Sequence, residues 1–135
     1  MSASYAPPPP PRGFGTSAWG VALHAALLFG LFVLYVIYVP PAAQVFDRYA
    51  LTLPKVTRFV VSLSTLVADY WWALGLAAGA ALVADFAAIW ALRRTGAAQA
   101  VALIATVALL LVAYGALTVY AVEYPKEKLR EGLSR

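Results

Sequence analysis

The chain contains no cysteine, only one histidine and few charges, which make up 12% of its 135 residues. The lack of cysteine excludes disulfides and thiolate metal sites. The shortage of charge, together with a mean hydropathy of +0.78, lies outside the range of ordinary soluble domains. The composition therefore predicts a membrane protein without a separate soluble core of usual size.

Signatures of catalysis are also missing. The sequence has no Gly-x-Ser-x-Gly elbow, no phosphate-binding glycine loop, and no cluster of His, Asp and Glu at metal-ligand spacing. Asp69 and Asp85 lie too many turns apart on one predicted helix to act as a carboxylate pair. We therefore expect no enzymatic activity, no cofactor and no metal. The net charge of +4 is spread over the loops and the C-terminal tail, which favours membrane lipids as partners and argues against nucleic acid.

Long apolar runs, by contrast, are abundant. The runs 17–39, 70–92 and 97–122 each exceed the roughly 20 residues that a helix needs to cross a hydrocarbon core of about 30 Å. They predict an all-α integral membrane protein with three transmembrane helices in one domain. The first run is longer than the apolar region of a signal peptide and has no cleavage site before Pro40, so we expect it to be retained.

The two ends of the chain differ from the spans. Residues 1–16 carry a run of prolines from Pro7 to Pro11, a composition typical of a disordered or semi-rigid proline-rich tail. Residues 123–135 mix lysine and arginine with glutamate after Pro125. This mixture indicates a charged tail at the membrane surface, either a short solvated helix or a frayed end.

The segment between the first two spans has the most specific pattern. Pro40 and Pro41 predict the end of the first helix, because proline has no N–H and clashes with the preceding turn. Residues 44–53 then form a polar connection, and Pro54 stands where a new helix can begin. Apolar residues at spacings of three and four predict an amphipathic interfacial helix over 54–69 that continues into the second span.

This segment also carries a family resemblance. A Val-Pro element, a Leu-Pro-x-x-Thr element, a serine-containing helix and aromatic residues at the second span follow one another over about residues 31–92. The order and spacing resemble the membrane part of the type II secretion system F family, the inner-membrane platform proteins of type II secretion and type IV pilus assembly. The resemblance implies a multi-pass protein of the bacterial inner membrane that acts through protein interaction. The motif positions are Pro40, Phe46, Leu53, Pro54, Thr57, Ser64, Tyr70 and Trp71.

The chain departs from that family outside the membrane part. Family members carry helical cytoplasmic domains before the first membrane helix and between the second and third. In those places this chain has the proline-rich tail and only residues 93–96. The contacts that those domains make with the assembly ATPase are therefore not expected here.

The second span contains two signs of packing against other helices. Gly75 and Gly79 form a pair of small residues four apart, which lets helix backbones approach closely in lipid. Asp85 costs about 2.5–3.5 kcal/mol near the centre of a span, a large penalty for an alanine-rich helix. We expect Asp85 to be protonated, to reach a partner within a bundle, or to lie nearer the interface at Arg93.

The only histidine, His24, follows Gly20 by four residues. This Gly-x-x-x-His pattern is found in membrane helices that ligate a pigment or haem, where the glycine makes room for the macrocycle. It makes His24 a candidate cofactor ligand, beside the commoner role of a packed or headgroup-facing histidine.

The leading interpretation is a small multi-pass membrane protein that acts through helix–helix and protein–protein contacts. Its partners would be other membrane proteins or further copies of itself. The alternative is a cofactor-binding subunit, or an ion- or proton-handling subunit, of a larger membrane complex that uses His24 or Asp85.

Overall fold

The structure is a computed structural model that describes residues 14–50 and 52–133, and these residues form helices and no strand. Of the proline-rich tail expected over 1–16, residues 1–13 lie outside the described part and 14–16 already belong to the first helix. In chain order the elements are α1 (Phe14–Val33), the π-helical turn η1 (Leu34–Tyr38), α2 (Val39–Arg48), α3 (Lys55–Asp69), α4 (Trp71–Thr95) and α5 (Ala97–Leu133).

Three helices in the described part of the chain are long and apolar enough to cross a membrane: Gly15–Arg48, Trp71–Thr95 and Ala97–Gly132. This confirms the prediction of an all-α fold with three candidate transmembrane helices. The first of them has 34 residues and is therefore about 50 Å long. A hydrocarbon core is about 30 Å thick, so the helix is longer than such a core is thick.

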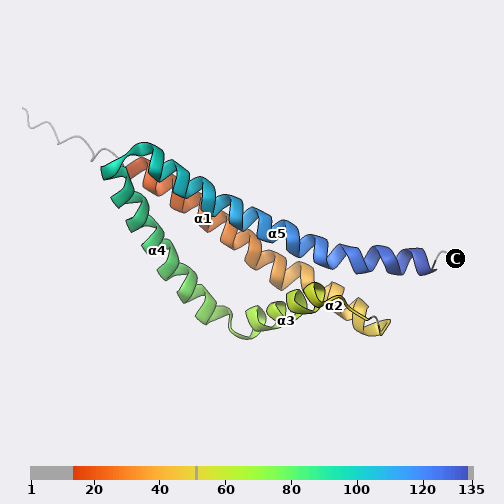
Figure 1. Cartoon of the computed structure of the whole chain (residues 1–135). Helices are drawn as coiled ribbons and strands as arrows, with labels where there is room; N and C mark the ends of the chain where they lie inside the picture. The colour runs from red at the N-terminus through yellow and green to blue at the C-terminus, as the bar shows by residue number, and fades with distance from the viewer. Residues whose placement is uncertain (1–13, 51, 134–135) are drawn as a thin grey trace, which may run out of the picture.

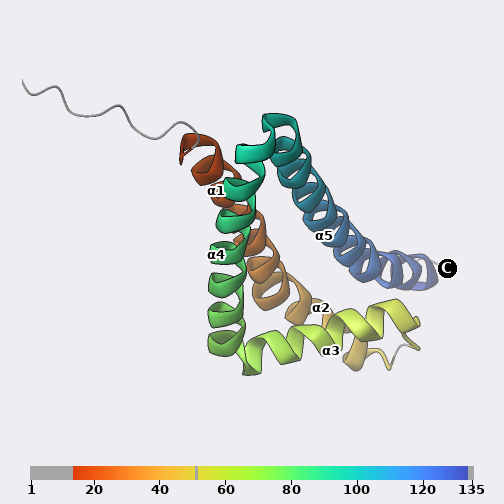
Figure 2. The same ribbon diagram turned by 60° about the vertical axis from the view of Figure 1, so that its left-hand side comes forward.

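The helices form a frame that is closed at both ends (Figures 1 and 2). At one end α1, α4 and α5 converge near the turn that joins α4 to α5, where Arg93 donates a hydrogen bond to the Thr16 hydroxyl. At the other end η1, α2, α3 and the C-terminal half of α5 pack together. Between the two ends α4 diverges from α1, and α3 runs crosswise to close the frame (Figure 2).

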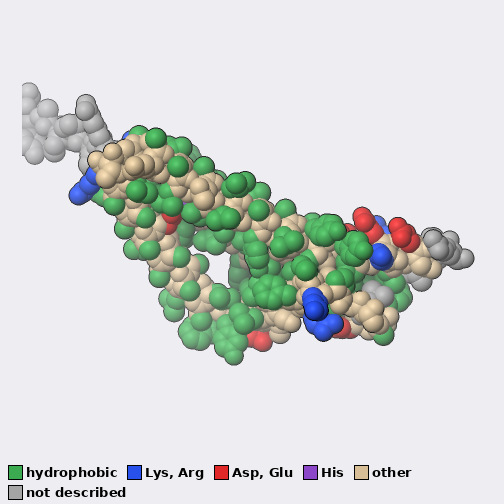
Figure 3. Space-filling model, in the orientation of Figure 1, with side chains coloured by type: hydrophobic (Ala, Val, Ile, Leu, Met, Phe, Trp, Pro, Cys, Tyr) green, Lys and Arg blue, Asp and Glu red, His purple; other side chains and the backbone are tan. Residues whose placement is uncertain are grey.

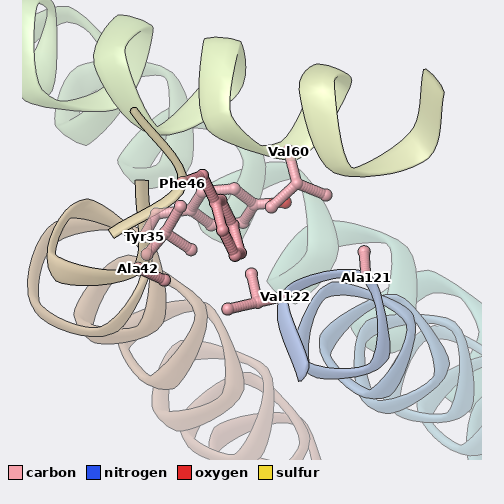
Figure 4. Packing of buried hydrophobic residues seen from close by; sticks show 7 residues of the cluster. Tyr35, Ala42, Phe46, Val60, Ala121 and Val122 are labelled. Carbon is pink, nitrogen blue, oxygen red and sulfur yellow. The ribbon is translucent and has the colours of Figure 1, made fainter. Parts of the chain in front are cut away.

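The main apolar core, here called the α2–α3–α5 junction, lies at the second of these ends (Figure 4). Its side chains come from η1, α2, α3 and α5, so their packing fixes α3 across two longer helices. Phe46 fills the centre and is 1% exposed. The buried members are Tyr35, Val39, Ala42, Phe46, Val60, Ala121 and Val122.

The first helix does not end at Pro40 and Pro41, contrary to the prediction. It continues through η1 into α2 and ends at Arg48, so the first part of the predicted connection 44–53 is helical. The prolines occupy the first turn of α2, where a missing N–H is tolerated. The turn before them widens to a π-helix, in which an N–H bonds to the carbonyl five residues earlier instead of four.

This π-helical turn and the proline after it leave one carbonyl without a backbone donor. The N–H of Val39 bonds to the carbonyl of Leu34, five residues earlier. Pro40 has no N–H, so the carbonyl of Tyr35 has no donor four or five residues ahead. The hydroxyl of Ser64 on α3 donates to this carbonyl at 2.6 Å.

Pro125 likewise leaves a carbonyl of α5 without a backbone donor. This helix continues through Pro125 to Leu133, so the predicted tail over 123–135 is helical and continuous with the span as far as the structure describes it. The carbonyl of Ala121 receives no N–H from the proline four residues ahead, and the hydroxyl of Thr57 donates to it at 2.7 Å. Side-chain donors of this kind make helix prolines tolerable where water is absent.

The structure has a helix over Lys55–Asp69, close to the predicted bounds 54–69, but this helix is not continuous with the second span. The chain bends at Tyr70, which has φ −117° and ψ 26° and ends α3 as it begins α4. The buried face of α3 also differs from the predicted apolar stripe, because it contains the hydroxyls of Thr57 and Ser64. The bend allows α3 to keep these hydroxyls on the junction while α4 runs in another direction (Figure 2).

Candidate functional site

His24 and Asp85, identified separately in the sequence, meet between α1 and α4. The Nδ1 atom of His24 lies 2.6 Å from Oδ2 of Asp85, and its Nε2 atom lies 3.0 Å from the main-chain carbonyl of Ile104 on α5. The His24 side chain is 2% exposed and that of Asp85 is 16% exposed. One imidazole therefore joins all three candidate spans, and Asp85 reaches a partner within the bundle.

Gly20 sets the spacing of the helices at this point. A Cβ atom at Gly20 would lie 2.7 Å from Cδ1 of Ile104 and 3.0 Å from Cδ1 of Ile89. The absence of a side chain lets the helices lie close enough for His24 to reach α5. The space that the Gly-x-x-x-His pattern would offer to a macrocycle is filled by isoleucine side chains, and both ring nitrogens of His24 are hydrogen-bonded.

On the α3 side of this pair, α4 and α1 separate and leave an apolar opening, here called the α1–α4 window. It has a volume of about 760 Å³, and Figure 3 shows it as a gap between α4 and the rest of the molecule. α1, η1, α3 and α4 form its walls, and Tyr114 contributes from α5. Residues that line it include Phe29, Phe32, Leu63, Trp71, Gly75 and Gly79.

The predicted glycine face of α4 opens onto this window. No side chain and no other helix of the described residues lies within 4 Å of the position that a Cβ atom would take at Gly75 or Gly79. The two glycines therefore pack against no other helix in the described part of the chain. Asp85, the third predicted packing residue of this helix, does make its contact within the chain.

A cluster of hydroxyl groups beside the window was not expected from the sequence. The hydroxyl of Tyr35 lies 2.9 Å from that of Tyr114 and 3.0 Å from Oγ1 of Thr118. The two tyrosine rings are stacked, with centroids 6.3 Å apart. The cluster ties η1 to α5. Tyr114 and Thr118 stand four apart on one helix face, which is the one sequence signal that could have indicated it.

Five of the eight motif positions converge on the α2–α3–α5 junction. Phe46, Thr57 and Ser64 are buried there, and Leu53 packs against the apolar cluster. Because Pro40 has no N–H, the carbonyl of Tyr35 lacks a backbone donor, and Ser64 donates to that carbonyl. These five positions therefore lie where α3 packs against the two helices beside it.

The other three motif positions mark helix ends. Pro54 precedes the first residue of α3, Tyr70 stands between α3 and α4, and Trp71 begins α4. The side chains of Tyr70 and Trp71 are 56% and 61% exposed. Aromatic side chains exposed at the end of a span are typical of the membrane–water interface.

Comparisons of the chain with protein-family models, with curated proteins and with solved structures found no match. Within residues 14–50 and 52–133, no group of three or more His, Asp or Glu side chains is placed to hold a metal ion. The features that bear on function are therefore the chain's own: the His24–Asp85 pair, the α1–α4 window and the α2–α3–α5 junction.

Proposed function

We propose that this chain is a small multi-pass membrane protein that binds a transmembrane helix of another protein chain in the α1–α4 window. In this proposal it is not an enzyme and carries no cofactor. Its surroundings are the lipids of a bacterial inner membrane, and its partner is another membrane protein or a second copy of the same chain.

The observation that carries the proposal is the unpacked glycine pair. Gly75 and Gly79 lie one turn apart on the window side of α4, and no other helix of the described residues approaches them within 4 Å. Lipid tails are as apolar as leucine, so membrane helices associate through close packing, and pairs of small residues are where their backbones approach. The pair is thus suited to a helix that the described part of this chain does not supply.

The rest of the window suits the same occupant. Its lining is almost entirely apolar, and the side chains of Phe29 and Trp71 are 67% and 61% exposed. A partner helix lying alongside α4 would cover the glycines and place its own side chains between α4 and α1. It would also cover aromatic surface that otherwise faces lipid.

The resemblance to the type II secretion system F family is part of this proposal. The motif positions gather where Thr57 and Ser64 hold α3 against α5 and η1. We expect this way of holding an interfacial helix to be what the two share. A partner surface within the membrane also fits the tight turn at Gly96, which joins α4 to α5 where the family has a cytoplasmic domain.

The alternative of a cofactor- or ion-handling subunit has less support. Neither nitrogen of His24 can ligate a metal or a pigment without breaking a hydrogen bond, to Asp85 in one case and to Ile104 in the other. The side chains of Ile104 and Ile89 occupy the space beside Gly20. An absorption spectrum of the purified protein tests this alternative, and we expect no band at wavelengths longer than those of the aromatic side chains.

Replacement of both glycines tests the main proposal. Gly75→Leu combined with Gly79→Leu puts bulk into the window, and the two added Cβ atoms meet no side chain and no other helix of the described residues, so we expect the protein to fold as before. Association, measured by a two-hybrid assay within membranes and by resonance energy transfer in vesicles, should weaken by about tenfold or more.

The matched control is Gly30→Leu. Gly30 is an exposed glycine of α1 with nothing within 4 Å, and it does not line the window. This substitution should leave association unchanged. If the Gly75 and Gly79 double variant associates as well as the unaltered chain in both assays, the window is not the partner site.

A further inference from the structure

Asp85 stands near the middle of the weakest candidate span. The most apolar stretch of α4 has a mean hydropathy of 1.8, against 2.3 and 2.5 for the other two spans. About 12 Å of helix separates Asp85 from Arg93, so the carboxyl group is not at the end of the helix. Its side chain is 16% exposed and makes a 2.6 Å contact with His24.

Hydrogen bonding fixes the number of protons that this pair holds. A main-chain carbonyl can only accept, so Nε2 of His24 carries a hydrogen in its contact with Ile104. The 2.6 Å contact between Nδ1 and Oδ2 of Asp85 requires one further hydrogen. That hydrogen makes either an imidazolium with a carboxylate or an imidazole with a carboxylic acid. The pair has a net charge of zero in both arrangements.

The pair lies where α4 begins to leave α1. Ala25 and Leu28, just after His24 on α1, line the window, and so do Ala81 and Leu82, just before Asp85 on α4. On the α3 side of the pair the two helices are separated by the opening. The interaction between His24 and Asp85 is therefore at the edge of the contact between these helices.

We infer that the His24–Asp85 pair, which has no net charge, allows Asp85 to lie within the membrane and thereby keeps α4 inserted as a span. Because His24 belongs to α1, we call this pair the latch between α1 and α4. An unpaired Asp85 is a charged or strongly polar group in an alanine-rich helix, and α4 alone holds it in lipid poorly. α1 supplies the neutralising partner, and the carbonyl of Ile104 on α5 orients it. Stable insertion of α4 therefore depends on a residue of α1.

The latch predicts unequal effects of removing its two members. His24→Leu leaves Asp85 without a partner in the span, which should impair insertion. Asp85→Leu makes α4 more apolar and leaves a neutral imidazole still bonded to Ile104, so insertion should stay close to that of the unaltered chain. The double variant has neither polar group and should also insert.

The absence of cysteine makes a clean measurement possible, because one introduced cysteine is the only labelled site. Ala98→Cys lies at the start of α5, after the α4–α5 turn, and Thr52→Cys lies in the connection before α3; both positions are exposed. A maleimide that does not cross membranes, applied to spheroplasts and to inverted vesicles, should label these cysteines from opposite sides. With His24→Leu, labelling of Ala98→Cys from its native side should fall by about tenfold, and the double variant should restore it.

Each result decides the inference. Unchanged labelling with His24→Leu would overturn it, and so would an equal defect with Asp85→Leu. A double variant as defective as His24→Leu would show that the packed imidazole itself is required, and not neutralisation of Asp85. If the His24→Leu variant does not accumulate, the amount of each variant in the membrane is measured instead of labelling. A normal amount of the double variant supports the latch, and a low amount of both variants contradicts it.

Discussion

The hydroxyl of Ser64 donates a 2.6 Å hydrogen bond to the carbonyl of Tyr35, which Pro40 leaves without a backbone donor. Thr57 does the same, at 2.7 Å, for the carbonyl that lies four residues before Pro125. The helix α3 is thus attached at two points where a proline leaves a carbonyl of a neighbouring helix without its backbone donor. Residues that would be expected to break helices instead create the acceptors that α3 binds.

Ser64→Ala should destabilise the junction. The substitution leaves the Tyr35 carbonyl buried and unpaired, at a cost of about 0.5–2 kcal/mol. Reversible unfolding in detergent micelles measures this loss. Ser62→Ala is the matched control because Ser62 is an exposed serine of the same helix, and it should change stability little.

Pro40→Ala should make Ser64 less important. Alanine at position 40 restores an N–H that can reach the carbonyls four or five residues earlier. In a double-mutant cycle the cost of Ser64→Ala should therefore be smaller beside Pro40→Ala than alone. Strictly additive costs would show that Ser64 stabilises the junction for a reason other than the missing donor.

The second attachment point gives an independent prediction. Thr57→Val keeps the shape of the side chain but removes the donor to the Ala121 carbonyl, and unfolding should again become easier by about 0.5–2 kcal/mol. Thr65→Val is the control, since the Thr65 hydroxyl is exposed and donates within its own helix to Val61. Equal effects of the two substitutions would contradict the proposed role of Thr57.

Gly20→Ala should loosen the packing of the three spans. The new Cβ atom would lie 2.7 Å from a side-chain atom of Ile104, so that side chain must move, at a cost of about 1–3 kcal/mol. The same substitution at Gly30, which has nothing within 4 Å, should be nearly neutral. Thermal unfolding in detergent compares the two variants, and equal midpoints would mean that Gly20 does not set the spacing.

The sequence was sufficient to predict the three candidate spans and the helix α3, because length, hydropathy and three-and-four spacing are local properties. It was misleading at Pro40, where a local rule predicts a helix end, and it did not indicate that the last helix continues through Pro125. The donors that make those prolines acceptable, Ser64 and Thr57, come from a helix that is distant in sequence from each of them. Such compensation depends on tertiary packing, which a local rule does not include.

The candidate site could be predicted in its parts but not in its assembly. His24 and Asp85 each stood out as polar residues in apolar runs, yet nothing in either run pairs them. The acceptor at Ile104 is a backbone carbonyl, which has no side-chain signature in a sequence. The window follows from the divergence of α4 from α1, which results from the bend at Tyr70 and the attachment of α3.

The orientation of the chain in the membrane is a further prediction, on which charge and resemblance disagree. Counting basic residues places the α2–α3 connection and the C-terminus in the cytoplasm. The family resemblance places them on the opposite side, with the N-terminus and the α4–α5 turn inside. The two sets of basic residues are Arg12, Arg93 and Arg94 on one side, and Arg48, Lys55, Arg58, Lys126, Lys128, Arg130 and Arg135 on the other.

We predict the orientation given by the resemblance, because its spacing runs through both of the first two spans. Glutamates at 123, 127 and 131 also offset part of the charge of the C-terminal segment. A reporter that is active only outside the cytoplasm, fused after Arg135, should then be active. Silence of that reporter, with activity of a cytoplasmic one at the same position, would reverse the orientation.

Site-specific photo-crosslinking in native membranes tests the window as a partner site most directly. A benzophenone attached to Ala78→Cys lies in the window, whereas one attached to Val83→Cys lies on the outer face of α4, where Val83 is 72% exposed. The window position should give a discrete protein adduct that Gly79→Leu abolishes, and the outer position should not. Identical patterns from the two positions, or an adduct that persists with Gly79→Leu, would contradict binding of a partner helix in the α1–α4 window.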